Sequence, residues 1–468
     1  MKKKCIIFGC GQIGTAAYLK LKSIYDILAW SDNNKELWGQ KKNDVLIIPP
    51  ARISEYDTFS DLDVVVTIGE SEPIIEQLLS LKTRSIVIYK AGLLFQYRSE
   101  GYMLPYQCDM EYIVDTNENV LFVQTEACIR THKIAKALKN SGKKVYLAYL
   151  MAPPTVSNPE YSQIYETTIP IISFDSFIDF VNHSNFEYVH SSNEPDILSM
   201  LLGYCNKAII HDCHDLSSAY KRMTPEELTI EYIAHKKSAG IIYTTENIRQ
   251  QAVKKYHLEK ERTFVLGNLI SEELSPKEYL PKLSSIDGEL HCVYEGGVVA
   301  GDRSSHRYFE EIWKKIAQAG VHIHFYTNCQ QEYCNHLESI HPNIHYEGNC
   351  SSMELVTEMT QYDVGLYALN ITHHNKKYAE FASPNKIQEY VSAGLPVAVT
   401  EVESIIEYVD KNGFGKRLNM DADIYSQIKE ISKVKIPRNI LHKKALTLES
   451  NIPELLEFID QIKGNVNR

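Results

Sequence analysis

Short apolar runs alternate with amphipathic stretches of helical period along almost the whole chain. This alternation is typical of parallel sheets covered by helices, because each strand is then buried on both faces and each helix on one. The pattern starts afresh three times. At 468 residues the chain is also too long for one core, since domains hold roughly 100–200 residues. We therefore expect an α/β protein of three consecutive units.

The strands are predicted from the apolar runs, and each unit takes its own set. The first unit has 4–8, 27–30, 45–48, 64–68 and 85–89; the second has 120–123, 145–150, 188–190, 208–211, 240–243 and 263–267; the third has 290–294, 322–326, 344–346, 364–368 and 397–400. The periodicity fades over 95–115, which predicts a linker. The expected domains are 1–110, 117–280 and 286–445, followed by a C-terminal helix over 446–468.

Charge and composition exclude several classes of protein. The net charge of −11 disfavours a nucleic-acid binder held by bulk charge. No apolar run approaches the roughly 18–20 residues that span a bilayer, and the apolar stretch after the first lysines is too short for a signal peptide. The ten cysteines are scattered without a CxxC pair, which favours reduced thiols and a cytoplasmic location, with the inner face of the membrane as a further possibility.

A glycine loop separates the first strand from the first helix. Gly9, Gly11 and Gly14 have GxGxxG spacing, which lets a pyrophosphate approach the helix N-terminus. Asp32 ends the next strand, where its carboxylate can accept ribose hydroxyls. The unit is thus expected to be Rossmann-like and to bind NAD or another nucleotide; alternatively, the glycines only let helix and strand pack closely. It resembles the nucleotide-binding domain found beside bacterial polysaccharide-biosynthesis enzymes.

The third unit contains the most informative segment, a loop, helix and strand over 383–397. Pro384 suits a helix start, and Gly394 suits the residue after its end. Glu389 lies about one turn inside the helix, where its carboxylate can accept two ribose hydroxyls. The loop N–H groups ahead of it can face a diphosphate.

This segment resembles the donor-binding segment of family-4 retaining glycosyltransferases, which have the two-lobed GT-B architecture. The resemblance implies that Glu389 holds the nucleotide ribose and that a basic pair binds the leaving diphosphate. Candidate donor residues are Gly296, Gly297, Ser383, Asn385 and Glu389, and the candidate basic pair is Arg303 and Lys386. The family often has a second glutamate eight residues before the first. This chain has Phe381 there, with Glu380 one position off.

Ionisable residues also gather at the end of the strand 208–211. The string His211-Asp212-Cys213-His214-Asp215 lies where open α/β sheets bind ligands. The family resemblance implies a catalytic His214–Asp215 pair facing the acceptor cleft; a core or surface histidine is the alternative. Neighbouring side chains in one string do not converge easily on an ion, and no DxD motif ends a strand. We therefore expect no metal site.

A basic stripe is predicted on the first helix of the second unit. Cationic residues recur there every three residues and continue beyond it: Arg130, Lys133, Lys136, Lys139, Lys143 and Lys144. The stripe could contact anionic lipid at a membrane surface, or it could be an ordinary solvated face.

Taken with the resemblance, these features predict a glycosyltransferase. Its donor would be a UDP- or GDP-sugar, its acceptor a hydroxyl of a glycan or lipid-linked acceptor, and its context the synthesis of cell-surface polysaccharide, capsule or glycolipid. Transfer would proceed with retention and need no cofactor or metal, and the N-terminal domain would bind its nucleotide without taking part. Two alternatives stay open: a non-catalytic sugar-nucleotide-binding sensor or scaffold, and an NAD-dependent sugar-nucleotide enzyme.

Overall fold

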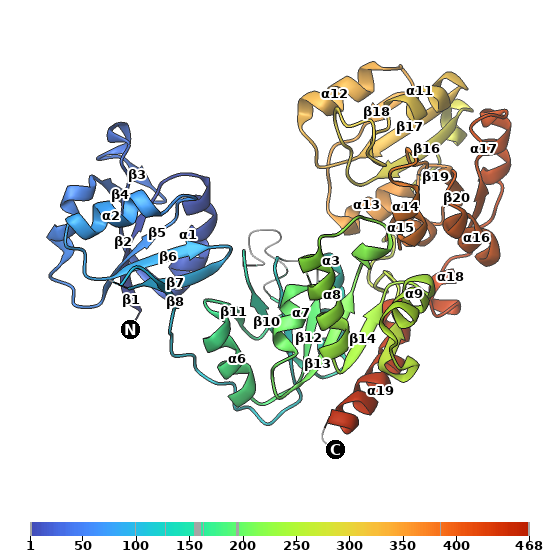
Figure 1. Cartoon of the computed structure of the whole chain (residues 1–468). Coiled ribbons are helices and arrows are strands. Elements are labelled where there is room, and N and C mark those ends of the chain that lie inside the picture. Colours follow the sequence, from blue (N-terminus) through green and yellow to red (C-terminus); the bar gives the residue numbers. More distant parts are fainter. Residues whose placement is uncertain are drawn as a thin grey trace. The chain divides into compact units, whose positions relative to one another are not determined.

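The computed structural model describes residues 2–98, 100–126, 128–153, 161, 163–192, 196–383 and 385–466. They form three sheets flanked by helices (Figure 1), so the α/β class is as the sequence predicts. The chain divides into two compact units: Met1–His214, Pro225–Ile242 and Ile459–Arg468 make one, and Asp215–Thr224 and Tyr243–Phe458 make the other. None of the described helices is both long and apolar enough to cross a membrane.

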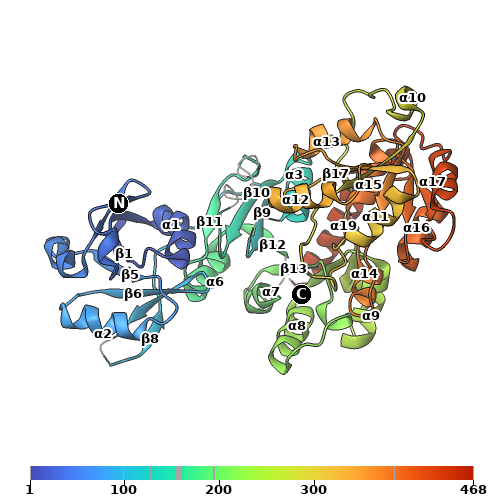
Figure 2. The same cartoon turned by 90° about the horizontal axis from the view of Figure 1, so that it is seen from above.

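The N-terminal sheet has the order β3-β4-β2-β1-β5-β6-β7-β8. Its strands are β1 (Lys3–Phe8), β2 (Tyr25–Ser31), β3 (Lys41–Lys42), β4 (Val45–Ile48), β5 (Leu62–Val66), β6 (Ile86–Lys90), β7 (Leu93–Tyr97) and β8 (Met103–Pro105). Helices α1 (Gln12–Ile24) and α2 (Glu72–Ser80) pack on its two faces, because Ile7 on β1 joins the core of α1 and the adjacent Phe8 joins the core of α2 (Figure 2).

The predicted linker over 95–115 is wrong in its first half. Strands β7 and β8 lie there and extend the sheet, β7 antiparallel to β6 and β8 antiparallel to β7. Leu94 on β7 donates its backbone N–H to the carbonyl of Ile172 at 2.9 Å, and Ile172 itself belongs to the N-terminal core. The segment therefore ties the first domain to the second sheet, instead of separating them.

The second sheet has the order β11-β10-β9-β12-β13-β14-β15. Its strands are β9 (Asn119–Gln124), β10 (Lys144–Tyr149), β11 (Thr168–Pro170), β12 (Phe186–Ser192), β13 (Ala208–Cys213), β14 (Gly240–Tyr243) and β15 (Thr263–Val265). Its helices are α3 (Ile129–Asn140), α6 (Phe174–His183), α7 (Ile197–Leu202), α8 (Pro225–Lys237) and α9 (Glu246–Tyr256). The strand pairs from β11 to β13 are all parallel, so the carboxyl ends of β12 and β13 lie side by side.

The third sheet is parallel throughout, with the order β18-β17-β16-β19-β20-β21. Its strands are β16 (Leu290–Glu295), β17 (Val321–Tyr326), β18 (Ile344–Tyr346), β19 (Val364–Tyr367), β20 (Val397–Val399) and β21 (Gly415–Arg417). Its helices are α10 (Ser284–Asp287), α11 (Glu310–Gln318), α12 (Gln331–Ser339), α13 (Ser352–Met359), α14 (Lys376–Phe381), α15 (Asn385–Ser392), α16 (Glu403–Asn412) and α17 (Ile424–Ser432), followed by α18 (Ile440–Lys443) and α19 (Leu448–Val466). The helix predicted in the donor segment is thus α15, while Pro384 lies outside the described residues.

Candidate functional site

The turn after β16 is built to hold positive charge close to the backbone. Gly296 has φ +116°, a conformation that L side chains rarely adopt, and a Cβ there would lie 2.9 Å from Nζ of Lys386. A Cβ on Gly297 would lie 2.8 Å from a guanidinium nitrogen of Arg307. The backbone conformation favours glycine at Gly296, and the absence of a side chain at both glycines leaves the space that the two cations occupy.

Lys386 comes from the first turn of α15 and is positioned by an aromatic ring. Its Nζ lies 4.4 Å from the ring centroid of Tyr294 and donates a 3.2 Å hydrogen bond to the hydroxyl. That hydroxyl in turn donates to the carbonyl of Gly297 at 2.8 Å. The contact fixes the ammonium against the glycine turn without neutralising it, and neither Lys386 nor Arg307 forms an ion pair within the described part of the chain.

The basic residue at this turn differs from the sequence prediction. Arg303 is exposed, and its backbone carbonyl accepts a hydrogen bond from the Asn370 side chain at 2.9 Å. Arg307, four residues later, is the arginine that lies beside Gly297. The path of the loop between β16 and α11 determines which arginine lies beside Gly297. A loop has no periodic residue pattern, so the sequence does not predict its path.

Glu389 shares a helix face with Lys386, since residues three apart on a helix are neighbours. Its side chain is half-buried and makes no hydrogen bond or ion pair among the described residues. Ser383, at the start of the same segment, accepts a 2.7 Å hydrogen bond from the Asn268 side chain at its carbonyl. Asn385 is the first residue of α15. The segment therefore presents one cation and one uncommitted carboxylate.

Glu380, the glutamate next to the position of the family's second glutamate, stabilises the start of α16. Both carboxylate oxygens of Glu380 accept backbone N–H groups at the start of α16, from Glu403 at 3.1 Å and Ser404 at 3.0 Å. Phe381 is buried. An additional sugar-facing carboxylate at this place in the chain is therefore unsupported.

A cavity of about 410 Å³ lies next to this segment. Its lining includes Asn268, Ser383, Gln388 and Tyr408, but none of Gly296, Gly297, Lys386, Arg307 or Glu389. It shares Ser383 with the donor segment, so it adjoins the cationic turn without containing it.

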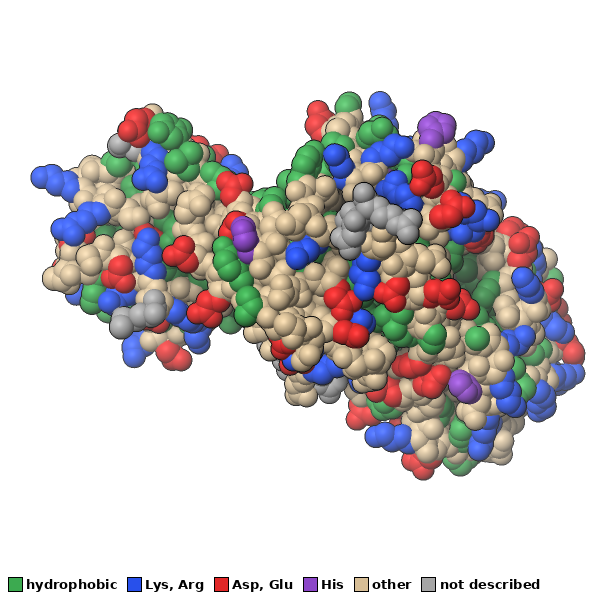
Figure 3. Space-filling view, turned by 90° about the horizontal axis from the view of Figure 1, so that it is seen from below, with side chains coloured by type: hydrophobic (Ala, Val, Ile, Leu, Met, Phe, Trp, Pro, Cys, Tyr) green, Lys and Arg blue, Asp and Glu red, His purple; other side chains and the backbone are tan. Residues whose placement is uncertain are grey.

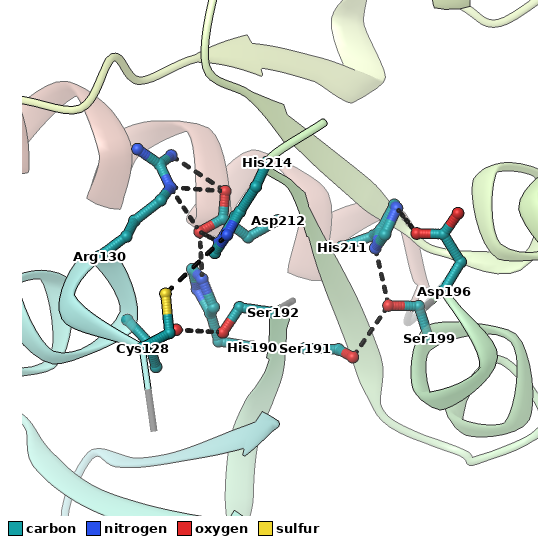
Figure 4. A network of polar contacts seen from close by, with 11 residues as sticks. Cys128, Arg130, His190, Ser191, Ser192, Asp196, Ser199, His211, Asp212 and His214 are labelled. Carbon is teal, nitrogen blue, oxygen red and sulfur yellow. Dashed lines mark hydrogen bonds and ion pairs between the residues drawn. The ribbon is translucent and has the colours of Figure 1, made fainter. Parts of the chain in front are cut away.

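The acceptor-lobe candidates belong to a buried ionic network around Asp212 (Figure 4). Arg130 binds this carboxylate through two nitrogens, at 2.9 and 3.0 Å. His190 and His214 approach it with Nε2 at 3.3 and 3.4 Å. Burial alone would raise the pKa of Asp212, but the charge of Arg130 and the contacts from both histidines hold it well below its usual value.

His214 connects this network to a thiol. Its Nδ1 lies 3.9 Å from Sγ of Cys128, at the N-terminus of α3. Burial opposes the charged ring, yet the charge and hydrogen bond of Asp212 raise the pKa of His214 to about 9. Burial likewise opposes the thiolate, while His214 and N–H groups of α3 lower the pKa of Cys128. The structure thus places His214 against Asp212, and the predicted pairing of His214 with Asp215 stays a prediction.

The prediction that the basic stripe forms a free cationic surface is wrong. Arg130 is 8% exposed and bound to Asp212. Lys139, Lys143 and Lys144 pair with Glu166, Glu118 and Asp115 at 3.3, 2.7 and 2.5 Å. On the face drawn in Figure 3, blue and red side chains are interspersed. A helical period of three reports which residues share a face, but it cannot show that acidic partners come from other elements.

The glycine loop of the N-terminal domain is explained largely by packing. A Cβ on Gly14 would lie 2.1 Å from the carbonyl oxygen of Gly9, whereas a Cβ on Gly11 would meet nothing within 4 Å. The carboxylate of Asp32 accepts N–H groups from Cys10 at 2.8 Å and Asn34 at 2.9 Å. Gly9 and Gly14 thus serve close packing, Asp32 holds the loop, and Gly11 alone borders open space. An NAD site is not supported by these contacts.

Two family models match parts of the chain. Residues 298–446 match the family model described as the glucosyltransferase 3-like C-terminal domain, and residues 1–86 match the C2185-like N-terminal model. No curated protein sequence matches the chain.

Two solved structures are similar over most of the chain. A glycosyltransferase from Rickettsia africae ESF-5 is 14% identical with a TM-score of 0.54, covering 74% of this chain and 99% of that one. The Anabaena protein HepE in complex with UDP is 12% identical with a TM-score of 0.50, covering 75% of this chain and 98% of that one. The chain therefore has the predicted two-lobed GT-B fold behind an N-terminal α/β domain.

Proposed function

We propose that this protein is a glycosyltransferase that moves a sugar from a nucleoside diphosphate sugar to a hydroxyl acceptor with retention. The observation that carries the proposal is the glycine turn after β16, where Arg307 and Lys386 approach the backbone without a carboxylate partner among the residues that the structure describes. Two cations at such a turn match the charge of a diphosphate. The similarity to a glucosyltransferase domain and to the structure of HepE in complex with UDP supports UDP as the carrier.

In the proposed reaction the diphosphate leaves from the face that the acceptor attacks. The bond from the anomeric carbon to the phosphate oxygen breaks, the bond to the acceptor oxygen forms, and the acceptor proton moves to the leaving phosphate. Arg307 and Lys386 stabilise the charge that develops on this phosphate, which removes the need for a metal there. Glu389 holds the ribose, Ser383 and Asn385 border the donor, and His214 with its carboxylate partner contacts the acceptor.

The acceptor proposed is a glycan or lipid-linked hydroxyl in the synthesis of cell-surface polysaccharide or glycolipid. This assignment rests on the family-4 resemblance and on the type of N-terminal domain. The competing function is a non-catalytic sugar-nucleotide sensor. Glu380 caps α16 and so does not supply the sugar-facing carboxylate of the family. This departure favours the sensor.

Two arginines on one loop, Arg307 and Arg303, allow a matched test of the diphosphate assignment. Arg307→Ala removes a guanidinium beside the turn, so we expect at least about tenfold weaker UDP binding, the loss of a charged hydrogen bond of roughly 1.5–3 kcal/mol. Arg303→Ala, on the same loop but not beside either glycine, should change affinity by less than about twofold. Calorimetry with UDP measures both.

Activity is then tested with UDP- and GDP-sugars, with and without lipid extract. Release of UDP, with the product's anomeric configuration read by NMR, would support a retaining transferase. Tight UDP-sugar binding without turnover on any acceptor would identify the sensor instead. Equal UDP affinity of the two arginine variants would contradict the diphosphate assignment.

A further inference from the structure

Three side chains able to bind a metal converge inside the second sheet, apart from the ionic network. His211 and Cys213 stand two residues apart on β13 and therefore point to the same face of the strand. His235 comes from α8, and one ligand atom from each of the three lies within 4.8 Å of the others. All three are buried, with exposures of 1%, 2% and 0%.

Hydrogen bonds fix which ring nitrogen of each histidine carries the proton. Nδ1 of His235 lies 2.7 Å from the backbone carbonyl of Glu231, and a carbonyl only accepts, so Nδ1 is protonated. Nδ1 of His211 lies 2.7 Å from the hydroxyl of Ser199, which itself donates to Ser191 at 2.8 Å. In both neutral rings Nε2 is left with the lone pair. Metal-binding histidines are held in this way, with the other nitrogen donating to a carbonyl or hydroxyl.

A carboxylate lies beside His211 but outside this cluster. Nε2 of His211 is buried and makes no hydrogen bond, while Oδ1 of Asp196 lies 3.4 Å away (Figure 4). Asp196 is not among the residues whose ligand atoms converge within 4.8 Å. A lone-pair nitrogen facing a carboxylate oxygen is repulsive, and a cation bound at the nitrogen would relieve this repulsion.

We propose that His211, Cys213 and His235 bind a structural zinc ion. Two imidazoles and a thiolate suit Zn²⁺. The three side chains are closed to solvent, as the ligands of structural zinc sites are, and the ion joins β13 to α8. Binding draws the three convergent ligand atoms together by roughly 1 Å, to the spacing of a tetrahedral site.

The test uses the full-length wild-type protein, freed of metal by a chelator under reducing conditions. We expect one Zn²⁺ bound per chain in competition with a chromophoric chelator, and a higher melting temperature with Zn²⁺. Co²⁺ in place of zinc should give the visible bands of a tetrahedral site and a thiolate-to-cobalt charge-transfer band. No stoichiometric Zn²⁺ binding by the wild-type chain would overturn the proposal and leave a buried polar cluster.

Two variants identify the ligands. Cys213→Ser should abolish the thiolate-to-cobalt band, while Cys292→Ser, which exchanges an equally buried thiol on β16, should keep it. Ser199→Ala removes only the group that holds His211, and it should weaken Zn²⁺ binding roughly 10–100-fold. Persistence of the band in Cys213→Ser would overturn the assignment. If Cys213→Ser does not fold, the cobalt spectrum of the wild-type protein and the Zn²⁺ affinity of Ser199→Ala test the ligand assignment.

Discussion

At the scale of single residues, the buried carboxylate of Asp212 is the centre of the ionic network in the acceptor lobe. It is 0% exposed, accepts hydrogen bonds from Arg130 and lies within 3.4 Å of a ring nitrogen of each of two histidines. Arg130 lies 82 positions earlier in the chain. A buried charge with a bidentate partner is costly to expose unpaired, so each residue of this pair depends on the other.

Replacing Asp212 by Asn should therefore destabilise the protein strongly. The change leaves the Arg130 guanidinium buried without its counter-charge, which costs about 3–5 kcal/mol in comparable sites. Urea unfolding measures the loss. The double variant Arg130→Met with Asp212→Leu removes both charges, and it should be less destabilised than Asp212→Asn alone. Greater instability of the double variant would show that packing around the pair outweighs its charge.

Glu389 is the residue on which the donor assignment depends most. Glu389→Gln keeps the shape but removes the charge that would hold the ribose hydroxyls, a loss of roughly 1.5–3 kcal/mol. We expect at least about tenfold weaker nucleotide binding with little change in melting temperature, because the carboxylate has no partner within the described chain. Unchanged affinity by calorimetry would remove Glu389 from the site.

At the scale of elements, β16, β17 and β18 carry a ladder of four histidines. The register pairs His291 with His322 and His324 with His345. Nδ1 of His291 lies 2.9 Å from Nε2 of His324, and Nδ1 of His322 lies 2.8 Å from Nε2 of His345. Nitrogens at these distances share one proton, so full protonation of the ladder would break both contacts.

The ladder predicts a loss of stability in mild acid. Burial, and then the neighbouring histidines, lower the pKa of His291 and His345; the acidic groups that face the ladder are Asp287, Glu289, Glu338 and Glu347. Histidines with depressed pKa bind fewer protons folded than unfolded. Stability is therefore highest above the unfolded pKa of about 6.5 and falls as pH drops below it.

Melting temperatures near pH 7.5 and pH 5.5 measure this effect. His345→Gln should reduce the difference between the two values, because it removes one titrating ring and one ring-to-ring contact. His183→Gln, which changes an exposed histidine on α6, serves as the control and should leave the difference unchanged. An equal difference in all three proteins would assign the acid sensitivity to other groups.

At the scale of the whole molecule, the N-terminal domain is bound to the second sheet through buried contacts. Nζ of Lys20 donates to the carbonyls of Gly92, Leu150 and Ile171. Burial lowers the pKa of this lysine to about 7. Together with the contact between Leu94 and Ile172, this joins α1 and β7 to the ends of β10 and β11. The N-terminal domain is therefore packed against the second sheet and is not joined to it by a linker alone.

A chain that starts at residue 117 should consequently be less stable than the full chain. Deletion uncovers Ile172, which is 7% exposed in the complete structure, and leaves the carbonyls of Leu150 and Ile171 without Lys20. We expect a lower melting temperature and a greater tendency to aggregate. Equal melting temperatures for both chains would show that the domain junction contributes nothing to stability.

The local pattern of the sequence determined the three α/β units, the glycine turn after β16 and the helix that carries Lys386 and Glu389. These depend on strand and helix periods and on glycine conformations, which a short segment specifies by itself. Only the tertiary structure decided that Arg307 approaches the turn, that Arg130 lies buried against Asp212, and that His235 meets His211 and Cys213. These contacts join residues that are distant in the sequence, or residues whose position depends on the path of a loop. The periodicity of one segment contains no information on the partner that another segment brings to it.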